Sequence, residues 1–174
     1  MNKFFFVDLE TTGLDSRECK ILEVAAVITD NKLNILEEFS APIKVHSEDL
    51  SRMDEWCRTT HTQSRLLEDI QDAGIDLDEA EKALQRLKRK HFPVSKPPIS
   101  GSSVHFDKRF IDDHMKSFTK EISHRIIDVS TFMGALDAYW GFKLPTQPEP
   151  AHRALADIRQ SISYLKQYLE EFGR

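Results

Sequence analysis

Two carboxylates lie two residues apart at the end of the first apolar segment, where residues 3–9 read KFFFVDL and the turn residues Thr12 and Gly13 follow. If this segment is a strand, Asp8 and Glu10 point to the same face of a sheet. Like charges this close are unfavourable unless a cation or a proton neutralises them. Carboxylate oxygens are ligands that Mg²⁺ and Mn²⁺ prefer. The pair therefore indicates a metal site, although exposed strand-end carboxylates are the simpler interpretation of the pair alone.

Three further ionisable residues lie in later parts of the chain. Asp107 stands early in a predicted helix, and His152 follows a proline-rich stretch and precedes Asp157 by five residues. Because imidazole titrates near neutral pH, His152 is a candidate general base. Read singly, Asp107 and Asp157 also fit surface carboxylates beside basic residues, and His152 fits a histidine packed at the start of a helix.

The elements that would position these residues alternate between strands and helices. Apolar, β-rich segments predict strands over residues 3–9, 21–29, 35–45, 99–100 and 125–129. The turn signal Asp30-Asn31-Lys32 indicates that the second and third strands form an antiparallel hairpin.

Helical patterns follow the third, fourth and fifth predicted strands. They cover residues 47–90, a segment through Phe106 and Met115, residues 130–139, and a closing helix over 151–172. This order predicts an α/β fold, in which a mixed five-stranded sheet has an antiparallel hairpin at one edge and helices on both faces. The 174 residues fit a single domain, residues 1–174, because no linker divides them.

Charge and composition limit the classes of partner. The chain has 24 Lys+Arg against 29 Asp+Glu, a net charge of -5, whereas proteins that grip long nucleic acids are usually basic. If the substrate is a nucleic acid, the protein should contact few phosphates or carry metal on its carboxylates. The apolar run before Asp8 is too short for a membrane span. Cys19 and Cys57 form no CxxC pair, which favours a reducing, cytoplasmic setting.

The spacing of the five ionisable residues resembles a known pattern. Asp-x-Glu on a first strand, a later Asp, and His-x4-Asp near the end match the DEDDh exonucleases of the ribonuclease H-like fold. Over essentially its whole length the chain resembles the oligoribonuclease family. The resemblance is carried by FFFVDLETTGLD, by MDEWCRTTH at residues 53–61, by RIIDVST at 125–131 and by HRALADIRQSI.

The resemblance implies a 3′→5′ exonuclease that hydrolyses very short single-stranded oligonucleotides, dinucleotides in particular, to nucleoside 5′-monophosphates, as a homodimer. It implies two divalent metal ions, Mg²⁺ or Mn²⁺, near which His152 would be the general base. The ions would be held by the four carboxylates Asp8, Glu10, Asp107 and Asp157.

The resemblance also implies a set of substrate contacts. Leu14 would be an apolar wedge between two bases, and Trp56 and His61 would line the base and phosphate region. A 5′-phosphate cap would be made by Ser103, Arg125 and Ser130. Read locally, Leu14 and Trp56 also fit core residues, and Arg125 fits a surface ion pair.

Two departures from the family concern the substrate. Residues 101–107 read GSSVHFD, where the family usually has Gly-Asn-Ser-x-Gly-Gln-Asp. His124 stands where the family commonly has a tyrosine that reaches the partner subunit's site. These changes leave open the sugar preference, the length limit, and the contribution of the dimer to the site.

Three alternatives remain at this stage. The first is a DEDDh exonuclease that acts on deoxyribo-dinucleotides or on longer single-stranded DNA or RNA, as proofreading enzymes do. The second is a non-catalytic nucleic-acid-binding module, against which the presence of all five residues argues. The third is a plain structural role for the carboxylates.

Overall fold

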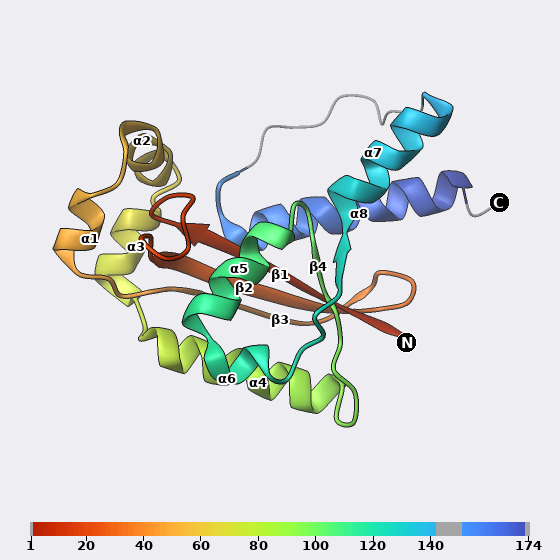
Figure 1. Ribbon diagram of the computed structural model, residues 1–174, viewed down its shortest axis with the longest axis horizontal. Helices are drawn as coiled ribbons and strands as arrows, with labels where there is room; N and C mark the ends of the chain where they lie inside the picture. The colour runs from red at the N-terminus through yellow and green to blue at the C-terminus, as the bar shows by residue number, and fades with distance from the viewer. Residues whose placement is uncertain (1, 142–150, 173–174) are drawn as a thin grey trace.

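Five strands form one sheet in the order β3-β2-β1-β4-β5. The computed structural model describes residues 2–141 and 151–172 (Figure 1). β1 (Lys3–Thr11), β2 (Ile21–Asp30) and β3 (Ile35–Pro42) pair antiparallel, whereas β4 (Ile99–Gly101) joins β1, and β5 (Ile126–Asp128) joins β4, in parallel. The predicted mixed sheet with an antiparallel hairpin at one edge is therefore confirmed.

β1 divides its side chains between the two faces of the sheet. Phe5 and Leu9 pack into the core on one face, and Phe6 packs into the core on the other. Asp8 and Glu10 continue the Phe6 face, because residues two apart in a strand point the same way. The apolar half of β1 thus anchors the strand, and its end presents two carboxylates.

Helices cover both faces of the sheet, as predicted. One face packs against α4 (Leu77–His91), α5 (His105–His114) and α6 (Lys116–Thr119). The other packs against α7 (Val129–Trp140) and α8 (Ala154–Phe172). In Figure 1 the two long helices α4 and α8 run on opposite sides of the central strands.

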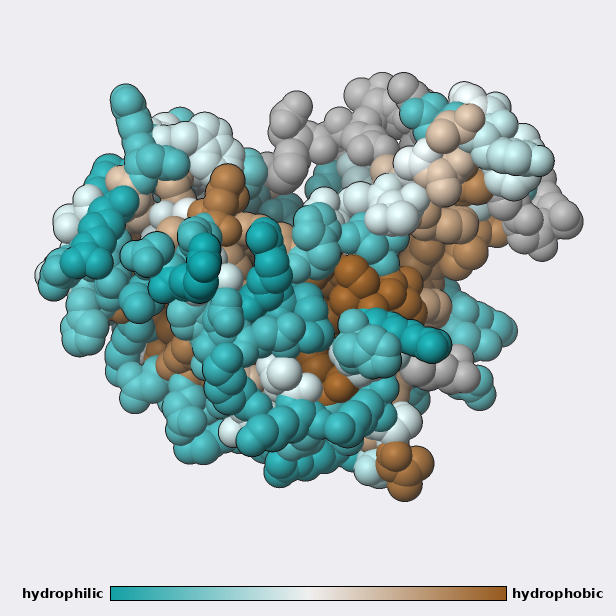
Figure 2. Space-filling model, in the orientation of Figure 1, coloured by the Kyte–Doolittle hydropathy of each residue, from teal (hydrophilic) through white to brown (hydrophobic). Residues whose placement is uncertain are grey.

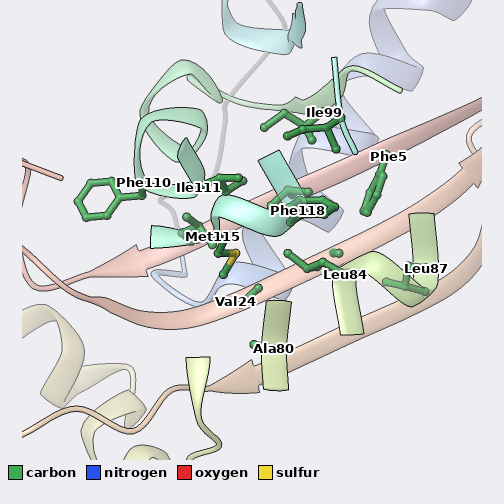
Figure 3. Packing of buried hydrophobic residues seen from close by; sticks show 14 of the residues in the cluster. Phe5, Val24, Ala80, Leu84, Leu87, Ile99, Phe110, Ile111, Met115 and Phe118 are labelled. Carbon is green, nitrogen blue, oxygen red and sulfur yellow. The ribbon is translucent and has the colours of Figure 1, made fainter. Parts of the chain in front are cut away.

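Aromatic rings fill the core between β1 and the helices α4, α5 and α6 (Figure 3). Phe5 stacks on Phe92 with ring centroids 6.0 Å apart, and Phe118 meets Phe5 edge-on at 5.8 Å. Both geometries are favourable for aromatic pairs. This core holds β1 in place from the side opposite its carboxylates.

Three short helices form a separate group at the end of the sheet. They are α1 (Ser47–Ser51), α2 (Glu55–Gln63) and α3 (Leu66–Ala73), and Figure 1 shows them beside the turn that follows β1. Asp54 caps α2 by accepting a hydrogen bond of 2.7 Å from the backbone N–H of Cys57. The cap lies two residues before Trp56 and fixes the start of α2 at Glu55.

Several predicted boundaries differ from the structure. The helical region 47–90 is split into four helices, and the third strand ends at Pro42 because Ile43 leaves β3 and bridges to Ile75. The first strand continues to Thr11. The fifth strand is shorter than expected, at residues 126–128. The closing helix begins at Ala154 rather than at residue 151, because His152 has a left-handed backbone with φ 51°.

The sheet opens between β1 and β4 just before the carboxylates. β4 pairs with β1 only through Phe5↔Ile99 and Phe6↔Ser100. Gly101 then passes so close to β1 that a Cβ there would lie 2.9 Å from the carbonyl oxygen of Val7. Past this point the open edge of β1 is free to bond with side chains. Within the described ranges, the structure holds no helix that is long and apolar enough to cross a membrane.

Truncation of the buried ring of Phe118 tests this account of the core. Phe118→Ala should lower the free energy of unfolding by about 3–5 kcal/mol, because it removes a buried aromatic and leaves a cavity. Val94, which is 98% exposed, supplies the control, and Val94→Ala should change the free energy of unfolding by less than about 0.5 kcal/mol. Urea denaturation measures both, and equal effects would contradict the assigned core.

Candidate active site

Three side chains from two distant parts of the chain meet at the end of β1. Ligand atoms of Glu10, His152 and Asp157 all lie within 4.8 Å of one another. Glu10 comes from β1, His152 from the segment before α8, and Asp157 from the first turn of α8. Two carboxylates and an imidazole at this spacing form a donor set for a divalent cation.

Asp8 and Asp107 complete the acidic cluster from deeper positions. The side chain of Asp107 accepts a hydrogen bond of 2.9 Å from the backbone N–H of Leu9. That N–H lies on the edge of β1 that β4 no longer covers. Because the sheet is open here, the first turn of α5 can place the Asp107 carboxylate beside β1. It contacts β1 at Leu9, the residue between Asp8 and Glu10.

Burial raises the pKa of every carboxyl in the cluster, and repulsion by the other cluster carboxylates raises those of Asp8 and Glu10 further. Burial raises the pKa of Asp8 well above its usual range, and the charges of Asp107, Glu10 and Asp157 raise it further. Burial, followed by the charge of Asp157, raises the pKa of Glu10 to about 8. Burial also raises the pKa of Asp107 to about 8, although the N–H of Leu9 opposes this shift. Burial raises the pKa of Asp157 as well.

His152 owes its position to an unusual backbone. In a regular helix, residues five apart lie about 140° apart around the axis, so His152 and Asp157 would not share a face. The positive φ of His152 and the start of α8 at Ala154 remove that constraint. The imidazole ring then lies edge-on to the indole of Trp56, with centroids 5.5 Å apart.

A pocket of about 390 Å³ opens beside Glu10. Leu14, Trp56 and His61, which the sequence predicted to contact substrate, all line it. Leu14 is 79% exposed and Trp56 is 64% exposed, so the interpretation of both as core residues is wrong. Their exposed apolar surfaces face a space with the volume of a small-ligand pocket.

His61 lies at the buried base of this pocket. Its Nε2 lies 3.0 Å from the carbonyl oxygen of Thr11, which can only accept, so Nε2 carries the proton. Its Nδ1 lies 3.9 Å from a carboxylate oxygen of Glu10 and has no hydrogen-bond partner among the described residues. Burial lowers the pKa of His61, so the ring is neutral at pH 7 and presents a lone pair toward Glu10.

Ser103 and Ser130 come together on the other side of the cluster. The backbone N–H of Ser103 donates to the hydroxyl of Ser130 at 3.1 Å, and Asp128 accepts from Ser103 and from the first turn of α7. Ser103 has a positive φ of 52°. Arg125 is exposed directly before β5, and in the described part of the chain its guanidinium makes no hydrogen bond to these serines.

Two further residues shape the pocket, and the sequence indicated one of them only as part of a departure from the family and missed the other. Phe106, from that departure, lines the pocket together with Leu14, and the guanidinium of Arg109 lies 5.6 Å from its ring centroid. Asp54 lines it and caps α2. The sequence signals were an aromatic directly before Asp107 and an N-cap residue two positions before Trp56.

Comparisons with known proteins agree with this geometry. The chain matches the family described as Exonuclease (RNase_T) over residues 5–165. An oligoribonuclease of Francisella tularensis subsp. holarctica is 38% identical over 172 residues, which cover 98% of this chain and 96% of that protein. A probable oligoribonuclease of Dictyostelium discoideum is 41% identical over 169 residues, which cover 95% of this chain and 88% of that protein.

Solved structures with the same fold include longer nucleases. Exonuclease I of Methylocaldum szegediense superposes with a TM-score of 0.72 at 17% identity, covering 100% of this chain and 42% of that one. The zinc-bound form of an E. coli exonuclease I complex with single-stranded DNA gives 0.73 at 21%, covering 100% and 42%. This chain therefore spans about two fifths of these nucleases, and their likeness confirms the predicted ribonuclease H-like fold. Together with the near full-length identity to the curated relatives, these matches show that the chain belongs to the exonuclease family and, within it, to the oligoribonucleases.

Proposed function

We propose that this protein is a metal-dependent 3′→5′ exonuclease that hydrolyses short oligonucleotides, dinucleotides in particular, to nucleoside 5′-monophosphates. The observation that carries the proposal is the convergence of Glu10, His152 and Asp157 beside a pocket lined by Leu14 and Trp56. Family membership supports the reaction. The pocket supports a short substrate, because its volume matches a small ligand.

The residues of the cluster fit a divalent metal site. Asp8, Glu10, Asp107 and Asp157 would hold two ions, Mg²⁺ or Mn²⁺, because their oxygens are hard ligands and a cation would offset both the burial of these carboxyls and the repulsion at Asp8 and Glu10. When bound, divalent ions of such sites activate water and stabilise the charge on a leaving oxygen. The acidic total charge of the chain agrees with this, since a dinucleotide presents few phosphates.

His152 is the residue that we propose as general base. It stands beside two of the carboxylates and is only half-buried, so its ring can face both the cluster and solvent. It would accept the proton of the water that attacks the scissile phosphorus, and imidazole suits this task near neutral pH. The edge-on contact with Trp56 limits the orientations of the ring.

The substrate would lie across Leu14, which separates two bases, and Trp56 and His61 would line the base and phosphate region. Ser103 and Ser130, which are already paired, would bind the 5′ phosphate together with Arg125. The structure supports the two serines more directly than Arg125, which stands directly before β5. An arginine that binds a terminal phosphate through two N–H groups would fit a limit on substrate length.

The remaining parts of the proposal concern the whole molecule. We propose that residues 1–174 act as one exonuclease domain, in a homodimer. β5 is an edge strand, and Tyr139 and Trp140 at the end of α7 are 78% and 60% exposed. Figure 2 shows hydrophobic surface along α7 and below it, on the side that a second copy would cover. The cytoplasmic setting expected from Cys19 and Cys57 stays a prediction; both are free thiols.

A length-and-sugar series of labelled oligonucleotides tests the reaction. With Mg²⁺ or Mn²⁺, the rate should be highest on dinucleotides and fall on substrates of five and twenty nucleotides, with nucleoside 5′-monophosphates as products. Asp157→Asn, the matched control of equal size, should abolish turnover and leave the fold intact. Faster cleavage of the long DNA would favour a proofreading-type enzyme, and full activity of Asp157→Asn would overturn the metal site.

The raised pKa values of Glu10 and Asp107 predict how stability depends on pH. The metal-free folded protein binds more protons than the unfolded chain between the ordinary carboxyl pKa near 4 and the folded value of about 8. Its stability should therefore fall as the pH rises through this window and level off above it. Bound cation removes the penalty, so Mn²⁺ should raise the melting temperature more at pH 8.5 than at pH 6.

Asp107→Asn is the control for this prediction, because the amide keeps an acceptor for the N–H of Leu9 and removes one charge. In EDTA at pH 8.5 the variant should melt higher than the unaltered protein, and Mn²⁺ should stabilise it less. The difference between the two proteins is the measured quantity, since other groups also titrate. Identical pH profiles and identical metal responses would contradict the assignment.

Arg125→Ala tests the phosphate cap. The KM for a 5′-phosphorylated dinucleotide should rise at least about tenfold, the loss expected for one charge-assisted bidentate contact, whereas the KM for the unphosphorylated dinucleotide should hardly change. Arg125→Lys keeps the charge without the planar fork, so its KM for the 5′-phosphorylated dinucleotide should lie between the KM of the unaltered protein and that of Arg125→Ala. An equal loss on both substrates would exclude the cap.

A further inference from the structure

Glu23 is a buried carboxylate that the proposed reaction does not use. It lies in β2, only 2% exposed, and its Cα faces that of Glu10 across the β1–β2 pair. Residues opposite one another in antiparallel strands share a face, so Glu23 adds a fifth acid beside four that already repel. If the position served packing alone, an apolar side chain would be the better occupant.

The carboxylate of Glu23 binds the segment that carries His152. Arg153 approaches it through Nε at 3.3 and 3.4 Å and through Nη2 at 3.1 Å, and the backbone N–H of Ala154 donates to its Oε2 at 2.9 Å. The same guanidinium donates to the carbonyl of Ser64 at 3.2 Å and pairs with Asp69 at 2.7 Å. The start of α8 is therefore held by contacts from both β2 and α3.

These contacts secure both sides of His152. On one side, the backbone N–H of Ala151 donates to the side chain of Asp157 at 2.9 Å. On the other, Arg153 and Ala154 are bound to Glu23. A positive φ at a residue other than glycine persists only when its surroundings hold it, and His152 is such a residue.

We infer that Glu23 and Arg153 are a positioning pair, which holds the left-handed turn at His152 and so directs its imidazole toward Glu10 and Asp157. The inference rests on the proposed function, in which His152 is the base. Without the pair, the segment can relax into a regular helical start, and the ring would turn away from Asp157 because of the angle between residues five apart. Neither Glu23 nor Arg153 needs to touch the substrate.

The paired variant Glu23→Gln/Arg153→Met tests the inference without leaving one buried charge uncompensated. On a dinucleotide with saturating Mn²⁺, kcat should fall by about 10–100-fold, the range found when residues that orient catalytic groups are lost. KM should stay within about twofold, because base and phosphate contacts are unchanged. Asp69→Asn removes the partly exposed contact of the same guanidinium and should leave kcat nearly unchanged.

Trp56 supplies a readout that needs neither metal nor turnover, since the ring of His152 lies against its indole. In a Trp140→Phe background Trp56 is the sole tryptophan, because the chain has two. The emission maximum and iodide quenching of the metal-free paired variant should shift toward the values of His152→Ala. Asp69→Asn should keep the emission of the background protein.

Combining the paired variant with His152→Ala separates positioning from general damage. If the pair acts through His152, the combined variant should be no slower than His152→Ala alone. An additive loss, or unchanged kcat and Trp56 emission in the paired variant, would overturn the inference while leaving the proposed function intact. Near-normal activity of His152→Ala would instead overturn the role of the base in the proposed function.

Discussion

Repulsion among buried carboxylates is the constraint on which the rest of the site depends. Asp8, Glu10, Asp107 and Asp157 converge in a space where burial raises the pKa of each, and the neighbouring charges raise those of Asp8 and Glu10 further. A folded chain tolerates this only where backbone N–H groups and a rigid framework oppose the repulsion. The N–H groups of Leu9 and Ala151 supply part of that support, each directed at one carboxylate.

The framework in turn depends on the place where the sheet opens. β4 pairs with β1 for two residues and then stops, with Gly101 against the carbonyl of Val7. Because the edge of β1 is free beyond that point, α5 can place Asp107 against Leu9. A longer β4 would satisfy the same backbone group and leave no room for the carboxylate. The site therefore requires incomplete strand pairing at the point where the sheet would otherwise be most regular.

The sequence predicted the parts of the site that follow from short-range geometry. The shared face of Asp8 and Glu10 follows from the two-residue period of a strand, and the strands and their antiparallel hairpin follow from the apolar segments and the turn between them. The closeness of His152 and Asp157 could not be predicted this way, because it depends on a left-handed residue and on a helix that begins three positions later than its pattern indicates.

The residues that sequence reasoning missed share one physical cause. Glu23 stands inside the apolar run ILEVAAVI, where its charge was a signal, but its partner Arg153 is 130 residues away. Phe106 was indicated only as part of a departure from the family, and it lines the pocket that Leu14 and Trp56 also line. In both cases the deciding contact is tertiary, and a periodic pattern carries no information about it.

The two halves of the site differ in how firmly the fold holds them. The acidic cluster stands on β1 and on the first turns of α5 and α8, all packed against the central sheet. The exposed wall of the pocket comes from the turn at Leu14 and from α2, where Leu14 and Trp56 are exposed. A change in this wall therefore disturbs little of the core, whereas a change in the cluster disturbs strand pairing or helix starts. Phe106 lies at the boundary, since its ring lines the pocket and the next residue, Asp107, belongs to the cluster. Of the departures from the family at residues 102–106, Phe106 falls on this boundary, where a pocket contact can change while the carboxylates of the cluster keep their positions.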